Sequence, residues 1–225
     1  MQSATMNAAD TLHMLDPFEQ LHRDAGCADR ALVARVIAAF RNSGTLLGQF
    51  AANDTLHASS YLAVSPAYGR FLQATARTHD ARNIVEFGTG MGVSTTYLAS
   101  ALRANGGGRL IGTEWVPAKV DRARANLAAA GFADLVEIRS GDARITLQDV
   151  GAGVDLVLLD GEFDQYLAVL LLLEPFLATG AVILADNALD PDYIDYVRNP
   201  ANGYRSSVVR LDDGSCIEST TWTAA

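Results

Sequence analysis

The sequence predicts an α/β protein with a mostly parallel, doubly wound sheet. Short apolar runs of strand length alternate with runs of helical spacing between residues 83 and 186, and this alternation is typical of parallel sheets covered by helices. The first apolar run ends in the glycine-rich turn Gly88-Thr89-Gly90-Met91-Gly92, and a helical pattern opens at Val93. A strand, a glycine turn and a helix in this order form a ligand-binding corner, because free helix N–H groups point at the turn.

Composition narrows the class of protein. The chain has 225 residues, 49% hydrophobic and 19% charged, which is enough to bury a full core in one compact domain. Its net charge of −9 argues against a nucleic acid or an anionic membrane as partner, because both attract basic surfaces. Cys27 and Cys216 lie in no metal-binding spacing, and neither a secretory signal nor a membrane span is evident. We therefore expect a cytoplasmic protein.

The N-terminal part carries helical patterns with no strands between them. Residues 1–16 have no sustained pattern and are expected to form an arm. One predicted helix begins after the N-cap Asp29 and ends near residues 42–44. Two further helices are predicted over residues 46–53 and 67–78. We expect residues 1–62 to form an arm and a helical cap outside the sheet, and residues 63–225 to form the ligand-binding domain.

Strand and helix patterns then alternate to the end of the chain. Predicted strands cover residues 84–87, 109–114, 135–139, 155–160 and 181–186, and predicted helices cover 117–130, 143–149 and 165–177. Two last strands, 204–211 and 216–222, flank Asp212-Asp213-Gly214, a turn typical of a hairpin.

Glu86 separates the glycine turn from a dinucleotide-binding loop. The dinucleotide fingerprint is G-x-G-x-x-G, whereas Gly88, Gly90 and Gly92 give G-x-G-x-G. A carboxylate two residues before Gly88 would repel a pyrophosphate, but it suits a ligand that carries an ammonium or sulfonium charge. S-adenosylmethionine carries both, so we expect it to bind here. The alternatives are a tight turn without a ligand and a nicotinamide-dependent dehydrogenase.

Polar residues follow the other predicted strands, at the edge where open α/β sheets bind ligands. Glu114 is placed to accept the hydroxyls of an adenosine ribose, or to cap the next helix. Trp115 suits either an adenine face or the protein core. Asp142 is placed to accept from an adenine amino group, or to cap the helix that begins at Ala143.

Asp160, Asp186 and Asn187 end two further strands. Two carboxylates and an amide oxygen are hard ligands that suit Mg²⁺ or another divalent cation. Asp and Asn are also common as caps and turn formers. The spacing leaves both interpretations open.

Together these residues resemble the class I S-adenosylmethionine-dependent methyltransferases, and within them the cation-dependent O-methyltransferases related to catechol and caffeoyl-CoA O-methyltransferases. The resemblance runs from about Ala63 to Trp222. It implies a Rossmann-like sheet of seven strands in the order 3-2-1-4-5-7-6, with the last hairpin strand antiparallel. It also implies a small-molecule methyl acceptor, and relatives of this kind are commonly homodimers.

The resemblance implies roles for individual residues. Glu86 and Ser94 lie near the methionine part, Glu114 lies on the ribose, and Met91 and Trp115 form apolar walls. A metal bound by Asp160, Asp186 and Asn187 would hold two vicinal acceptor oxygens and lower the pKa of the attacking one. The implied cofactor-binding set is Val64, Glu86, Gly88, Thr89, Gly90, Met91, Gly92, Ser94, Glu114, Trp115, Asp142, Ala143 and Asp160.

One position departs from the family pattern. The family has Asp-x-x-Lys-Asp-x-Tyr, with the lysine as general base, whereas this chain has Phe163 in place of the lysine. Its only lysine, Lys119, lies on the helix after the second strand, away from the acceptor. Asp160 stays in the predicted catalytic set as a metal ligand. A metal-independent N- or O-methyltransferase and a binding module without turnover are the alternatives. Candidates for a different base are His57, Glu162 and Asp164.

Overall fold

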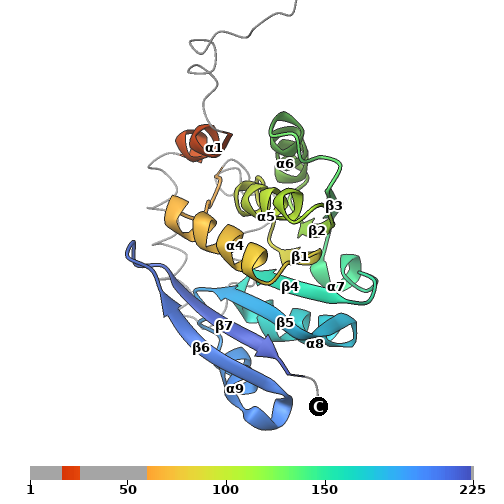
Figure 1. Cartoon of the computed structure of the whole chain (residues 1–225), viewed down its shortest axis with the longest axis vertical. Coiled ribbons are helices and arrows are strands. Elements are labelled where there is room, and N and C mark those ends of the chain that lie inside the picture. Colours follow the sequence, from red (N-terminus) through yellow and green to blue (C-terminus); the bar gives the residue numbers. More distant parts are fainter. Residues whose placement is uncertain (1–16, 26–59, 224–225) are drawn as a thin grey trace, which may run out of the picture.

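The computed structural model describes residues 17–25 and 60–223. Within that part of the chain, seven strands form one sheet (Figure 1). They are β1 (Asn83–Phe87), β2 (Arg109–Glu114), β3 (Val136–Ser140), β4 (Val154–Leu159), β5 (Leu177–Asp186), β6 (Tyr204–Arg210) and β7 (Cys216–Trp222).

The strand order is β3-β2-β1-β4-β5-β7-β6, which confirms the predicted topology. β1 to β5 pair in parallel, and β7 runs antiparallel to both β5 and β6. β1, β4 and β5 run parallel, so the glycine turn after β1 and the ends of β4 and β5 lie at the same, carboxyl edge of the sheet. The strand order reverses beside β1, and open sheets of this kind bind ligands at that point.

Helices cover both faces of the sheet (Figure 1). Apolar residues of α4 and α5 pack in one core cluster with β1, β4 and β5, and those of α7, α8 and α9 pack in a second cluster on the opposite face. The helices are α1 (Pro17–Ala25), α4 (Pro66–Thr78), α5 (Val93–Ala104), α6 (Pro117–Ala129), α7 (Ala143–Thr146), α8 (Tyr166–Leu173) and α9 (Pro191–Arg198), with 3₁₀ turns η2 (Phe163–Gln165), η3 (Glu174–Phe176) and η4 (Pro200–Asn202).

From Leu156 of β4 and from Val182 of β5 onward, side chains alternate between the two clusters. Leu158 of β4 and Leu184 of β5 are register partners on neighbouring strands, and both face α4 and α5. Their neighbours Leu159 and Ala185 face α8 and α9. Because side chains two residues apart share a face, residues 160 and 186 continue the face that α4 covers.

Several predicted bounds need correction. The expected helix over residues 165–177 is shorter, because Pro175 lies in η3 and the chain then enters β5 at Leu177, four residues before the predicted start. The short helix after Asp142 ends at Thr146 rather than at Asp149. Helices α1 and α9 were not predicted. The predicted arm over 1–16 and the helices over 29–44 and 46–53 lie outside the described residues.

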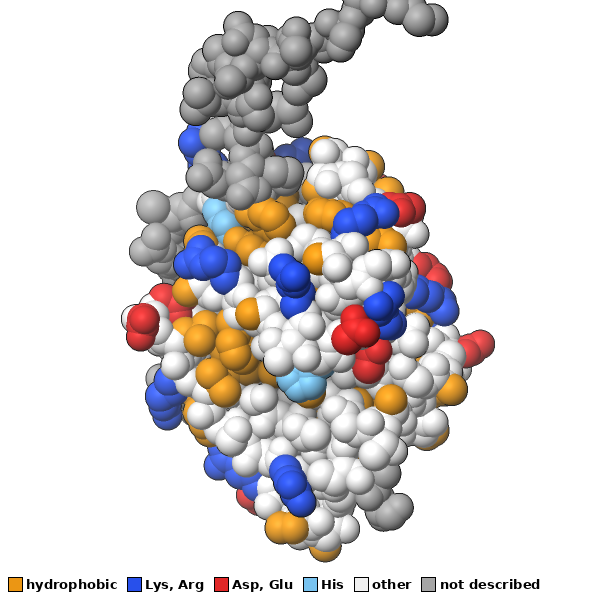
Figure 2. All heavy atoms as spheres, viewed as in Figure 1, with side chains coloured by type: hydrophobic (Ala, Val, Ile, Leu, Met, Phe, Trp, Pro, Cys, Tyr) orange, Lys and Arg blue, Asp and Glu red, His pale blue; other side chains and the backbone are white. Residues whose placement is uncertain are grey.

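The surface and the helix lengths add two observations. On the face shown in Figure 2, acidic and basic side chains lie interspersed, and arginine–carboxylate pairs such as Arg109–Glu137 join neighbouring strands at 2.7 Å. Among residues 17–25 and 60–223, no helix combines the length and the apolar character that crossing a bilayer requires.

Candidate active site

The glycine turn adopts a backbone that side chains would disfavour. Gly88, Gly90 and Gly92 have φ angles of 94°, 54° and 87°, in the region that favours glycine. A Cβ at Gly88 would lie 2.4 Å from the backbone oxygen of Asp160. The turn can therefore pack against the end of β4 only with glycine at this position.

Glu86 is the centre of a buried hydroxyl cluster. Its side chain is 0% exposed and accepts hydrogen bonds from Thr89 at 3.2 Å, Ser94 at 2.6 Å and Thr95 at 2.5 Å. Burial raises the pKa of Glu86, and the three hydroxyl donors oppose that rise. The carboxylate thus links the end of β1 to the first turn of α5 through Ser94 and Thr95, and to the glycine turn through Thr89. Sequence reasoning missed Thr95, whose only signal was its place one residue after Ser94.

Glu114 supports the same turn from β2. Its two oxygens accept the backbone N–H groups of Gly90 and Val116, each at 2.9 Å. Burial raises the pKa of Glu114, and these backbone donors oppose the rise. A carboxylate oxygen can accept more than one hydrogen bond, so Glu114 retains acceptor capacity for hydroxyl groups of a ligand.

Trp115 lies at the open edge of the sheet. Its side chain is 41% exposed, so the alternative of a core tryptophan is wrong. Ile145, on α7, is 68% exposed, and the Thr113–Thr146 hydroxyl contact of 2.6 Å holds α7 against β2. Exposed apolar side chains therefore follow both β2 and β3, as expected of walls for a planar ring.

Asp142 is the N-cap of α7, which was one of its two predicted roles. It accepts a hydrogen bond from the backbone N–H of Arg144 at 2.9 Å, and its carboxylate pairs with the guanidinium of the same residue at 2.5 Å. The Arg144 side chain holds the pKa of Asp142 below its usual range. Ala143 is buried behind it. A contact between Asp142 and an adenine stays a prediction.

Asp160 and Asp186 meet at the ends of β4 and β5. Their carboxyl groups are close enough to share a hydrogen bond. Burial, then the charge on Asp186, raises the pKa of Asp160 well above its usual range, and burial raises the pKa of Asp186 to about 7. Two carboxyl groups in this position cannot both ionise without a compensating charge.

Asn187 completes this corner with a left-handed backbone, φ 44°. Its N–H donates to the carbonyl of Cys216 and its Nδ2 donates to Asp186, both at 2.9 Å. This bond places the side-chain amide of Asn187 beside the carboxylate of Asp186. In the described part of the chain, no group of three or more His, Cys, Asp or Glu side chains is arranged for a metal. The carboxylate–amide set nevertheless fits a hard cation, because a divalent charge would relieve the repulsion between Asp160 and Asp186.

Phe163, which stands where the family has a lysine, packs in the apolar core. Phe163 is 8% exposed and meets Tyr166 edge-on, with ring centroids 5.7 Å apart. Glu162, the neighbouring base candidate, is half-buried and hydrogen-bonded to Gln165. Burial, and then the charge on Asp164, raises the pKa of Glu162. His57, the other candidate named from sequence, lies outside the described residues.

Residues 60–65 lie over the glycine turn. A Cβ at Gly90 would be 3.4 Å from the carbonyl oxygen of Tyr61, and the Tyr61 hydroxyl accepts from Arg122 of α6 at 3.2 Å. Val64 is buried in the same apolar cluster as α4 and α5. Met91 in the turn is also buried. The structure thus brings Tyr61, three residues before Val64, to the glycine turn, and a contact between Val64 and the cofactor stays a prediction.

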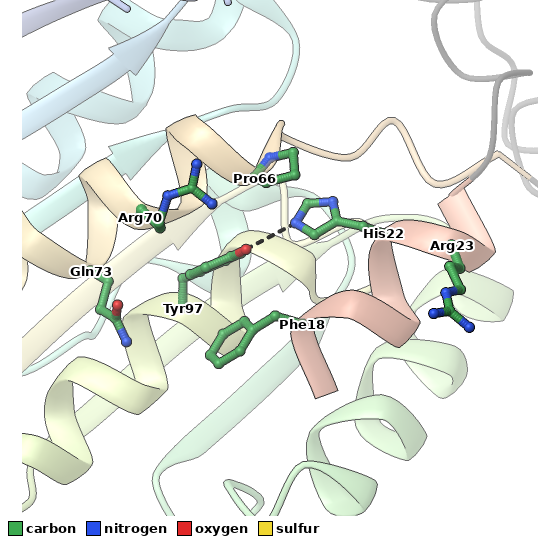
Figure 3. A pocket seen from close by; sticks show the side chains of 7 residues that line it. All are labelled: Phe18, His22, Arg23, Pro66, Arg70, Gln73 and Tyr97. Carbon is green, nitrogen blue, oxygen red and sulfur yellow. Dashed lines mark hydrogen bonds between the residues drawn. The ribbon is translucent and has the colours of Figure 1, made fainter. Parts of the chain in front are cut away.

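A cavity of about 690 Å³ lies among α1, α4 and α5 (Figure 3). None of the predicted site residues lines it. His22 and Tyr97 are hydrogen-bonded across it at 3.0 Å, and the ring of Tyr97 stacks near Phe18 at 4.3 Å. The lining residues of the cavity are Phe18, His22, Arg23, Pro66, Arg70, Gln73 and Tyr97.

Comparison with known proteins agrees with this geometry. A family model described as a methyltransferase domain matches residues 85–188. Catechol O-methyltransferase from Niastella koreensis is 36% identical over 132 residues, 57% of this chain and 59% of that protein. Catechol O-methyltransferase from Mycobacterium tuberculosis is 37% identical over 129 residues, 57% of this chain and 58% of that protein. The chain thus spans less than two thirds of the length of either relative.

A solved structure extends the likeness to the fold. The O-methyltransferase from Bacillus cereus in complex with SAH is 26% identical, with a TM-score of 0.65, and the match covers 71% of this chain and 82% of that one. The region that the family model matches, residues 85–188, contains the glycine turn, Asp160, Asp186 and the strands between them. By these likenesses and by its sheet order, the chain is similar to the class I S-adenosylmethionine-dependent methyltransferases, and within them to the catechol-type O-methyltransferases.

Proposed function

We propose that this protein transfers the methyl group of S-adenosylmethionine to a hydroxyl oxygen of a small, catechol-like acceptor, with a divalent cation at Asp160, Asp186 and Asn187. The observation that carries the proposal is the juxtaposition of two sites on one sheet edge. The glycine turn packs directly on the backbone of Asp160, whose side chain belongs to the carboxylate pair. Cofactor and acceptor would therefore meet at the same residue.

The cofactor would lie across the glycine turn. Glu114 would accept its ribose hydroxyls, and Trp115 and Ile145 would flank its adenine. Its positively charged methionine end would lie toward Asp160 and above Glu86, where buried negative charge is available. The complexes of the Bacillus cereus protein with SAH and of a Streptomyces achromogenes O-methyltransferase with SAM support this choice of cofactor.

The chain's own residues would place the acceptor. Asp160, Asp186 and Asn187 would hold Mg²⁺, which when bound supplies a positive charge that orients acceptor oxygens and favours their deprotonated form. The sulfonium is already activated, so the protein must mainly align the two reactants. Glu162 is the described residue that we propose as base, because it is half-buried, lies two residues after Asp160 in the sequence, and has a pKa that burial raises.

The loss of the family lysine supports a second candidate. With Phe163 buried in the core, a metal-independent N- or O-methyltransferase that needs no strong base is the main rival. A binding module without turnover and a nicotinamide-dependent dehydrogenase are weaker rivals. The cytoplasmic location and the homodimer expected from sequence also stay predictions.

Calorimetry tests the proposal. S-adenosylmethionine should bind to the wild-type protein, and catechol should bind to the loaded protein only when Mg²⁺ is present. Asp186→Asn should abolish the metal-dependent step while leaving cofactor binding within a few-fold. Asp192→Asn, which alters an exposed acid on α9, is the matched control.

The rivals give different results in the same samples. Methyl transfer that survives EDTA, followed by mass spectrometry, would favour the metal-independent enzyme. Cofactor binding without transfer to any hydroxyl or amine acceptor would favour the binding module, and a change in nicotinamide absorbance would favour the dehydrogenase. If S-adenosylmethionine does not bind, the proposal is wrong at its first step.

A further inference from the structure

The hydroxyl of Tyr68 is buried without a hydrogen-bond partner. The side chain is 2% exposed, and no polar atom among the described residues lies in bonding geometry to its Oη. Buried hydroxyls in native proteins are nearly always paired, because leaving one unpaired costs stability. An unpaired one therefore needs an explanation, and a ligand that pairs with it is one.

Tyr68 is held firmly by its backbone. It lies in the first turn of α4, and its N–H donates to the N-cap Ser65 at 3.0 Å. The Ser65 hydroxyl in turn donates to Asp213, in the turn between β6 and β7. The next residue, Gly69, packs directly under the ring of Tyr97. The start of α4 is thus anchored to the sheet edge and to α5, so the Tyr68 ring has a defined direction.

The Tyr68 ring points toward the carboxyl groups of Asp160 and Asp186. Tyr68 belongs to the same buried cluster as Leu158 and Leu184, and residues 160 and 186 continue the same face of β4 and β5. Burial raises the pKa of the Tyr68 hydroxyl, and the charges of Asp186 and then Asp160 raise it further. The phenol, with its proton retained, therefore faces the carboxylate pair.

Two other buried tyrosines serve different roles. The Tyr166 hydroxyl donates to the backbone carbonyl of Asp186 at 3.0 Å. The Tyr193 hydroxyl is likewise buried without a hydrogen-bond partner in the described part of the chain, but it lies on α9, where burial and then the charge of Glu218 on β7 raise its pKa, not the charges of Asp160 and Asp186. Tyr68 alone among these three comes from the helix that follows the segment over the glycine turn.

We propose that Tyr68 binds the methyl acceptor, its hydroxyl forming a hydrogen bond with an acceptor oxygen held at the Asp160–Asp186 corner. This inference rests on the function proposed above. It assigns the acceptor, not the cofactor, because Tyr68 faces β4 and β5 while the cofactor turn follows β1. It also supplies a polar contact in a site where the family lysine is replaced by the buried Phe163. The acceptor class is a phenol or catechol, which can both donate to and accept from a tyrosine.

Tyr68→Phe tests the inference, because it removes only the oxygen. We expect kcat/KM for a catechol to fall about tenfold, mainly through KM, as for the loss of one hydrogen bond. The Kd of S-adenosylhomocysteine should stay within twofold. The melting temperature of the protein alone should not fall, because no protein hydrogen bond is lost. A merely structural tyrosine would not give this combination. Tyr193→Phe is the control and should leave catechol kinetics unchanged.

The outcomes separate this inference from the proposed function. If the wild-type protein methylates catechol and Tyr68→Phe does so equally well, the Tyr68 assignment is wrong and the function stands. If Tyr68→Phe weakens S-adenosylhomocysteine as much as it weakens catechol, the hydroxyl serves the cofactor and the assignment is again wrong. If the wild-type protein binds the cofactor but neither binds nor methylates a catechol, the proposed acceptor class fails, and Tyr68 as its binding residue fails with it.

Discussion

The packing of the cofactor turn can be tested by one added methyl group. A Cβ at Gly112 of β2 would lie 2.2 Å from Oγ1 of Thr89, while Oε2 of Glu86 and the Cβ of Thr89 would each be at 3.4 Å, an ordinary contact distance. The backbone of Gly112 is not in the left-handed region, so alanine meets no conformational strain there. The whole cost of Gly112→Ala should therefore come from the Thr89 hydroxyl.

The geometry sets the expected free energies of unfolding. Gly112→Ala should destabilise the protein by about 1–3 kcal/mol through overpacking. Thr89→Ala removes the obstructing oxygen and one hydrogen bond to Glu86, at 3.2 Å, and should cost roughly 1 kcal/mol. In the double variant the new methyl group fits, and replacing glycine restricts the unfolded chain by roughly 0.5–1 kcal/mol. The double variant should thus be no less stable than Thr89→Ala alone.

Urea unfolding of the four proteins measures the coupling, with equal m-values as the check on two-state behaviour. Thr89→Val is the matched control, because it keeps an atom of similar size in place of the hydroxyl and should not rescue Gly112→Ala. If the double alanine variant loses the sum of the two single losses, the Thr89 hydroxyl does not lie over Gly112 and the described turn is wrong.

Three further predictions concern binding and pH. Trp115→Leu should weaken S-adenosylhomocysteine about tenfold in calorimetry, since an aromatic contact contributes roughly 1 kcal/mol beyond its area, and an unchanged Kd would contradict the adenine contact. In EDTA, wild-type stability should fall relative to Asp186→Asn as pH rises from about 4 to about 7, because burial raises the pKa of Asp186 to about 7 and the folded form then holds the extra proton; parallel urea curves for the two proteins would refute this. Burial and then the charge on Arg70 lower the pKa of His22, so stability should fall below about pH 6.5 and less so in His22→Gln; equal losses in both proteins would show that His22 does not report this site.

Much of the fold was open to prediction because it depends on local patterns. The strands β1 to β4, the hairpin of β6 and β7, and the helices α4 to α6 follow from apolar periodicity and glycine or proline signals. The order of the sheet came from a family resemblance carried by Glu86 and the glycine turn. Helix α9 had usable signals, Asp190 as N-cap and Pro191 at its first position, but it is only eight residues long.

Sequence by itself determined which chemical groups the chain possesses: the glycine turn, the acids at the strand ends and the absence of the family lysine. Only the tertiary structure decided what those groups touch. It enclosed Glu86 among three hydroxyls, exposed Trp115, brought Asp160 against Asp186 and left the Tyr68 hydroxyl unpaired among the described residues. The reason is that such contacts join residues far apart in the chain, and strand register and helix placement set them, whereas local periodicity reports only which face a side chain takes.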